Sequence, residues 1–126
     1  MSNLFQLGEF RLSSGIMSPF KIECDALTDE DWKCIAWLLN SRVKSFGRVF
    51  GIPKGGFKLA AAIRQYAEPD DPQGAILLVD DVFTSGASMR RAREELKVQA
   101  HESVIGAVVF ARNPTPDWIT ALFELR

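Results

Sequence analysis

The stretch ILLVDDVFTSGASM, from Ile76 to Met89, decides the fold of this chain. An unbroken apolar run ends in two adjacent carboxylates, and a Thr/Ser/Gly loop follows before a helical pattern begins. A continuous apolar run of this kind predicts a strand that is buried on both faces, as in a parallel sheet. Asp80 and Asp81 are then expected where the strand leaves the sheet, at its carboxyl end, and this is where open α/β sheets bind ligands.

The loop that follows the carboxylates predicts an anion site. It places backbone amides, three hydroxyls and one permissive glycine at a helix start, in the residues Thr84, Ser85, Gly86, Ala87 and Ser88. The first N–H groups of a helix have no partner inside the helix, and the helix dipole favours an anion there. Carboxylates for ribose hydroxyls beside amides for a phosphate predict a ribose 5-phosphate site. The alternative is a buried strand and a capped helix that bind nothing, although two aspartates in such a place are costly unless they are used.

Length and composition predict one compact α/β domain over residues 1–126. The net charge of −1 argues against a broad nucleic-acid surface, which needs clustered basic residues. No apolar run approaches the roughly 18 residues of a membrane span, and the start does not resemble a targeting segment. Cys24 and Cys34 have neither metal-ligand spacing nor the density of a disulfide scaffold. We therefore expect a cytoplasmic protein with no protein-built metal cage.

The order of elements predicts a small parallel sheet flanked by helices. Residues 1–27 are expected to be irregular or short-stranded and to fold over one end or edge of the sheet, whereas 28–126 form the α/β core. Within the core the expected elements are a helix from Thr28 with an apolar stripe reaching Val43, a strand at 48–52, a helix at 57–65, the strand and helix of the decisive stretch, a strand at 103–110 and a short helix around 118–123. Such alternation is typical of a parallel sheet with right-handed crossovers.

A second loop, Ile52-Pro53-Lys54-Gly55-Gly56, leaves one predicted strand just as the acidic motif leaves another. Both loops should therefore lie at the same end of the sheet. The glycines allow close approach of the backbone to an anion, and Lys54 adds a mobile charge suited to phosphate. Taken alone, this sequence also fits an ordinary tight turn.

The decisive stretch resembles the phosphoribosyl pyrophosphate signature of the type I phosphoribosyltransferases, in which hydrophobic residues, two acidic residues and a hydrophobic pair precede Thr-small-Gly-small-Ser/Thr. The stretch FRLSSGIMSPF, residues 10–20, resembles the amino-terminal hood of the orotate-specific members. The resemblance implies a phosphoribosyltransferase-like core with an N-terminal hood segment. It also implies that Asp80 and Asp81 hold the ribose, that 84–88 hold the 5′-phosphate and that 52–56 hold the pyrophosphate.

Two departures from the family pattern concern the base. The hood lysine that reaches the substrates in orotate-specific members is Ser13 here, and the loop lysine falls one place earlier, at Lys54. A carboxylated base needs a fixed cation. The resemblance offers Arg112 for this role, since an arginine after the corresponding strand contacts orotate, and Asn113 for a base edge. Arg112 is equally compatible with a solvated loop residue.

A further departure concerns the catalytic lid. Full-length orotate phosphoribosyltransferases carry a strand and a long flexible loop between the second helix and the acidic strand, but the connector 68–74 is too short for both and holds no Lys, Arg or His. The resemblance implies transfer of ribose 5-phosphate to a nitrogenous base with release of pyrophosphate. It implies Mg²⁺ bound mainly through the substrate, small-molecule partners and no nucleic acid or membrane, and it is compatible with a homodimer. The alternative is a regulatory module that binds phosphoribosyl pyrophosphate without turnover.

Overall fold

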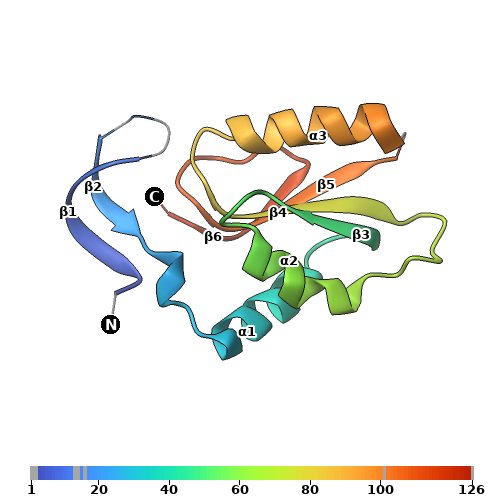
Figure 1. The fold of residues 1–126 in the computed structure, drawn as a ribbon, viewed down its shortest axis with the longest axis horizontal. Coiled ribbons are helices and arrows are strands. Elements are labelled where there is room, and N and C mark those ends of the chain that lie inside the picture. The colour runs from blue at the N-terminus through green and yellow to red at the C-terminus, as the bar shows by residue number, and fades with distance from the viewer. Residues whose placement is uncertain (1–2, 13–14, 16, 101, 126) are drawn as a thin grey trace.

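The computed structural model describes residues 3–12, 15, 17–100 and 102–125 of the chain. At its centre lies a four-stranded parallel sheet in the order β3-β4-β5-β6. Helix α3 covers one face of the sheet, and α1 and α2 cover the other (Figure 1). The elements are β3 (Phe46–Gly51), β4 (Ala75–Phe83), β5 (Val104–Ala111), β6 (Ile119–Glu124), α1 (Asp29–Asn40), α2 (Phe57–Ile63), α3 (Ala87–Ala100) and the short 3₁₀ turns η1 (Cys24–Ala26) and η2 (Arg64–Tyr66). The α/β prediction is confirmed.

Strand β4 is buried on both faces, as its continuous apolar run predicts. Leu77 and Val79 belong to the core under α1 and α2, whereas Ile76 and Leu78 belong to the core under α3. Because alternate side chains of a strand point to opposite faces, both faces need apolar residues when helices cover both.

Helix α1 begins where its capping residues predict. The Asp31 backbone N–H donates to Thr28 Oγ1 at 3.1 Å, and the Thr28 N–H donates to Asp31 Oδ2 at 2.8 Å, which together make a capping box. Leu39, near the end of the helix, is fully buried. The helix ends at Asn40, so Val43 packs on the core from the segment after it instead of continuing the helical stripe.

The prediction of a short helix around 118–123 is wrong, because this segment is strand β6, parallel to β5. Ile119 and Leu122 are three positions apart, a spacing that is also found on one face of a helix. In the strand, Ile119 instead packs into the core under α3 and Leu122 into the core under α1 and α2. A spacing of three is therefore compatible with a strand that has both faces buried. Phe123 of the same strand is 47% exposed and stacks on Phe110.

Strand β3 is an edge of the sheet, and the residues after α2 cover part of it. The Glu68 N–H donates to the carbonyl of Phe46 at 2.7 Å, and Arg64 Nη2 reaches the carbonyl of Val49 at 3.4 Å. These bonds satisfy carbonyl groups that a further strand would otherwise pair with. No described helix has the length and apolar character needed to cross a membrane.

The N-terminal segment forms a separate antiparallel hairpin of β1 (Phe5–Arg11) and β2 (Met17–Ile22), hereafter the hood. In Figure 1 the hood stands beside the carboxyl ends of the parallel strands. The Phe5 ring meets the Phe110 ring edge-on, with 5.7 Å between ring centres. The predicted placement of this segment at one end of the sheet is confirmed.

Candidate functional site

The paired carboxylates lie inside β4 instead of beyond it. Asp80 is in register with Val108 of β5, and the strand continues to Phe83, which is paired with Ala111. The expectation that both aspartates mark the exit of the strand is thus wrong by a few residues, because the ladder with β5 extends past them. Both side chains are half-buried and border a cavity at the carboxyl end of the sheet.

The two aspartates interact with each other and with the backbone. Asp80 Oδ1 accepts from the Asp81 N–H at 2.8 Å, and Asp81 Oδ1 accepts from the Val82 N–H at 2.7 Å. Burial, followed by the neighbouring Asp81, raises the pKa of Asp80 to about 8. Burial also raises the pKa of the Cys24 thiol to about 12, with a further contribution from Asp81. A pair in which one carboxyl group keeps its proton near neutral pH can both donate and accept hydrogen bonds, which suits hydroxyl ligands.

The glycine loop touches the acidic strand. A Cβ atom on Gly55 would lie 2.5 Å from Asp81 Oδ1, so only glycine fits there without a shift of the carboxylate or the loop. The Gly56 N–H donates to the carbonyl of Ile52 at 2.8 Å and closes the turn. The structure therefore brings the two predicted loops together at one end of the sheet. Pro53 and Gly55 line the cavity there, as does Ile52.

Lys54 stands apart from the rest of this loop. Lys54 is exposed and does not border the cavity, whereas its neighbours Pro53 and Gly55 do. The peptide bond between Pro53 and Lys54 is cis. The loop thus borders the cavity through Ile52, Pro53 and Gly55, and not through Lys54.

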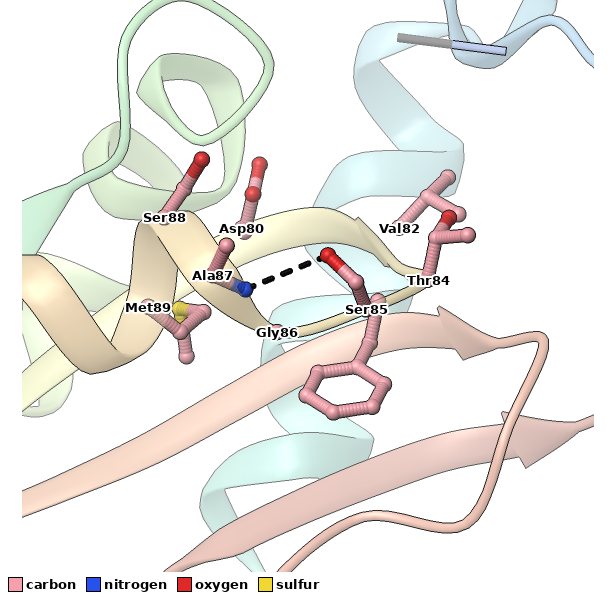
Figure 2. A pocket seen from close by; sticks show the side chains of 9 residues that line it. Asp80, Val82, Thr84, Ser85, Gly86, Ala87, Ser88 and Met89 are labelled. Carbon is pink, nitrogen blue, oxygen red and sulfur yellow. Dashed lines mark hydrogen bonds between the residues drawn. The ribbon is translucent and has the colours of Figure 1, made fainter. Parts of the chain in front are cut away.

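The loop 84–88 has the shape that its residues predict. Gly86 has φ +79°, a left-handed conformation that favours glycine, and a Cβ atom here would meet the Phe83 ring. Helix α3 starts at Ala87, whose N–H donates to Ser85 Oγ at 3.4 Å (Figure 2). The next backbone N–H, that of Ser88, makes no hydrogen bond to any residue the structure describes. This leaves a donor available for an anion at the helix start.

A pocket of about 220 Å³ lies directly on this loop. Asp80 and Ser88 project to the same side of it (Figure 2). Two side chains fix the loop from outside: Asn113 Nδ2 donates to the carbonyl of Thr84 at 2.6 Å, and Arg90 Nη1 donates to the carbonyl of Ser85 at 2.8 Å. Asn113 therefore supports the 84–88 loop through its backbone.

Arg112 connects the core to the hood. Its Nη1 donates to Ser18 Oγ at 3.0 Å, its Nη2 donates to the carbonyl of Phe20 at 3.2 Å, and its Cζ lies 4.2 Å from the centre of the Phe20 ring. Burial lowers the pKa of Arg112 from its usual value. Arg112 thus links the core to the hood, and it is not a solvated loop residue. Ser13 lies outside the described residues.

The hood closes a larger cavity of about 630 Å³ over these elements. Its walls come from the loop 52–55, the aspartate pair, the loop 84–88 and the hood, and they include Glu9, Arg11 and Lys21. These three hood residues were not singled out from the sequence. Side chains alternate between the two faces of a strand, so a sequence-based prediction of β1 and β2 as strands could have placed these residues on a common face.

An adjoining cavity of about 310 Å³ lies between the hood and the loop 84–88. It shares Arg112 and Thr84 with the larger cavity, and its other walls are mostly apolar, with Phe20 as the aromatic residue. Because the Arg112 guanidinium lies on the Phe20 ring, a small planar ring would have to lie beside this stacked pair, against the apolar walls.

No protein-family model and no curated protein sequence matches the chain. Solved structures do match. Orotate phosphoribosyltransferase from Aeropyrum pernix superposes with a TM-score of 0.77 at 23% identity, covering 97% of this chain and 88% of that one. The fold of this chain is that of the type I phosphoribosyltransferases.

Further structures of the same fold differ in their named substrates. Orotate phosphoribosyltransferase from Mycobacterium tuberculosis gives a TM-score of 0.70 at 19% identity, over 96% of this chain and 89% of that one. A purine phosphoribosyltransferase from Pyrococcus horikoshii gives a TM-score of 0.62 at 16% identity, over 79% of this chain and 85% of that one. The recognition of the phosphoribosyltransferase fold from sequence is confirmed.

Proposed function

We propose that this protein is a phosphoribosyltransferase, which binds phosphoribosyl pyrophosphate and transfers its ribose 5-phosphate to a nitrogenous base. One observation carries the proposal: the aspartate pair, the glycine loop 52–56 and the helix-start loop 84–88 all border connected space at the carboxyl end of the sheet. The neighbours in fold, which are named as phosphoribosyltransferases, support the same class.

In this proposal the substrate lies across the two loops. Its 5′-phosphate accepts hydrogen bonds from the free amides and hydroxyls of 84–88 at the start of α3, where the helix dipole favours an anion. Its ribose hydroxyls donate to the carboxylates of Asp80 and Asp81. Its pyrophosphate lies along 52–56, of which Ile52, Pro53 and Gly55 border the cavity.

The reaction exchanges one bond at the anomeric carbon. The bond from this carbon to the pyrophosphate oxygen breaks, and pyrophosphate leaves with the electron pair. The bond from a ring nitrogen of the base to the same carbon forms, and the proton of that nitrogen passes to solvent. Positive charge develops on the sugar during the exchange, and the neighbouring aspartate pair is placed to stabilise it.

Mg²⁺ fits this site as an ion that arrives with the substrate. Among the described residues there is no cluster of three or more metal-ligating side chains, so the protein alone offers at most the oxygens of Asp80 and Asp81. Mg²⁺ keeps several waters and is often held by one or two carboxylates together with substrate phosphates. When bound, it would offset negative charge on the pyrophosphate.

We place the base in the 310 Å³ cavity beside Phe20 and Arg112. There the ring would lie against the hood and next to the ribose. Two of the Arg112 nitrogen atoms already donate to Ser18 and to the carbonyl of Phe20. The proposal covers orotate-like and other nitrogenous bases, and Asn113, which borders the same cavity, is the candidate for a base edge.

A second candidate is a module that binds phosphoribosyl pyrophosphate without turnover. The observation that favours it is the connector between η2 and β4. This connector makes a compact turn, in which the Gly74 N–H donates to the carbonyl of Asp71, and it contains no Lys, Arg or His. No cation therefore reaches the pyrophosphate from this segment, and Lys54 is not among the described residues that border the cavity.

Calorimetric titration with phosphoribosyl pyrophosphate and Mg²⁺, followed by a pyrophosphate-release assay over a panel of bases, tests both candidates. We expect binding in the wild type, release with at least one base, and loss of both in the double variant Asp80→Asn with Asp81→Asn. The exposed Asp70→Asn is the matched control and should behave like the wild type. Binding without release for any base would favour the module, and an absence of binding would refute both.

A further inference from the structure

A second large cavity lies at the opposite end of the sheet. Its volume is about 720 Å³, and its walls include residues at the amino ends of three strands, namely Ala75 of β4, Val104 of β5 and Thr120 of β6. The segment 42–45, between α1 and β3, and Arg93 of α3 complete it. Because β4, β5 and β6 run parallel, this amino-end cavity is separated from the site above by the length of the strands.

The amino-end cavity carries an excess of positive charge. Arg42, Lys44 and Arg93 line it, and Asp117 is the one carboxylate among its described lining residues. Arg42 Nη1 donates to the carbonyl of Leu122 at 3.2 Å, whereas neither Lys44 nor Arg93 makes a hydrogen bond or ion pair with any residue described. Three cations against one carboxylate give the lining of this cavity an excess of positive charge on a chain whose net charge is −1.

Arg93 is held in place without an acceptor. Its Cζ lies 4.5 Å from the centre of the Trp118 ring, and Trp118 itself packs closely against Gly106. Its Nε is buried and has no hydrogen-bond partner in the described part of the chain. A guanidinium fixed on an aromatic ring loses little conformational freedom on binding, and its planar face and fork of donors suit both flat rings and phosphate oxygens.

The remaining polar groups are suited to a sugar. Ser103 and Thr120 contribute hydroxyls, and Gln73 contributes an amide, which can donate and accept hydrogen bonds. The volume lies within the roughly 300–1,000 Å³ of small-molecule sites. Cations that can meet a phosphate, neutral donors and acceptors, and a flat cationic wall thus occur together in one cavity.

We propose that the amino-end cavity binds a phosphomonoester that carries a planar ring, such as a nucleoside monophosphate. Its phosphate contacts Lys44 and Arg42, and its ring lies on the guanidinium of Arg93. A ligand held there would not compete with phosphoribosyl pyrophosphate for the carboxyl-end cavity. The proposal is independent of the proposed function, because none of its residues belongs to that site.

The test is calorimetric titration of the whole chain with UMP, with ribose 5-phosphate and inorganic phosphate as comparison probes. We expect UMP to bind the wild type, and we expect Lys44→Glu to weaken that binding at least about tenfold, since reversing a charge replaces attraction by repulsion. Arg93→Gln should weaken it as well. The matched controls Lys97→Glu and Arg91→Gln, both exposed on α3, should leave it unchanged.

Three outcomes would overturn the proposal. In the first, no probe binds at millimolar concentration. In the second, UMP binding responds to Ser88→Ala at the carboxyl-end site and is indifferent to Lys44→Glu. In the third, inorganic phosphate binds as tightly as UMP, which would leave no role for a ring on Arg93. Lys44 is exposed and has no partner among the described residues, so Lys44→Glu keeps the test valid even if Arg93→Gln fails to fold.

Discussion

Replacing Asp80 by Asn should make the protein more stable above neutral pH while it removes substrate binding. The pKa of Asp80 is raised from an ordinary 3.8 to about 8, first by burial and then by Asp81. The folded state therefore holds this proton more tightly than the unfolded state. For an acid with a raised pKa, the stability associated with the proton is present at low pH and is lost as pH rises from about 4 towards 8.

The size of the effect follows from the shift. About four pKa units correspond to roughly 5–6 kcal/mol at about 1.4 kcal/mol per unit. The side chain is only partly buried and borders an open cavity, so solvent screening reduces this, and we expect about 2–3 kcal/mol. Asp80→Asn keeps the shape of the side chain, cannot ionise, and so avoids this loss.

The assay is urea unfolding of the wild type and Asp80→Asn at several pH values between 5.5 and 8.5. This window avoids other shifted groups: the lowered pKa values of Glu23, Asp31 and Asp71 act below it, and the Cys24 thiol, with a pKa of about 12, acts above it. Wild-type stability should fall across the window, and that of Asp80→Asn should not.

Asp70→Asn, an exposed carboxylate, is the control and should follow the wild type. The reasoning is refuted if wild-type stability is flat or rises with pH over this window. It is equally refuted if Asp80→Asn and the wild type have the same free energy of unfolding at pH 8.5. In the second case the carboxylate would be well solvated, and the aspartate pair would not share a proton.

Three other substitutions test the packing around the site. Gly55→Ala places a Cβ against the Asp81 carboxylate, and it should cost about 1–3 kcal/mol in urea unfolding and weaken phosphoribosyl pyrophosphate binding, whereas Gly47→Ala, with only ordinary contacts, should do neither. Arg112→Gln removes the bridge to the hood, so limited proteolysis should cleave the hood faster while the core persists. Thr28→Ala breaks the capping box and should lower stability by about 1 kcal/mol, measured by thermal unfolding.

Features that depend on neighbouring residues were predictable from the sequence. The cap at Thr28, the two-sided burial of β4 and the turn at Gly86 each need information from a few adjacent positions, and each is found as predicted. Strand β6 was not predictable in this way. Burial of Ile119 and Leu122 fits one face of a helix as well as two faces of a strand, and only the presence of β5 alongside decides between them.

The site was predictable in its loops and not in its long-range links. The bond between Arg112 and Ser18 joins residues 94 positions apart, and nothing near either residue indicates the other. The extent of β4 beyond Asp80 likewise depends on where its partner strand ends, at Ala111. Local motifs thus identify which groups carry the chemistry, whereas tertiary pairing determines where those groups lie and what else borders them.

The residues that follow α2 cover the exposed edge of β3. The Glu68 N–H and the Arg64 guanidinium bind carbonyl groups there, so the sheet ends without unpaired acceptors at Phe46 and Val49. Positive charge lines the cavity at Arg11 and Lys21 of the hood and at Arg112 of the core. Removal of the hood should therefore weaken pyrophosphate binding, since it takes away Arg11 and Lys21 and leaves Arg112 as the remaining described cation that lines the cavity.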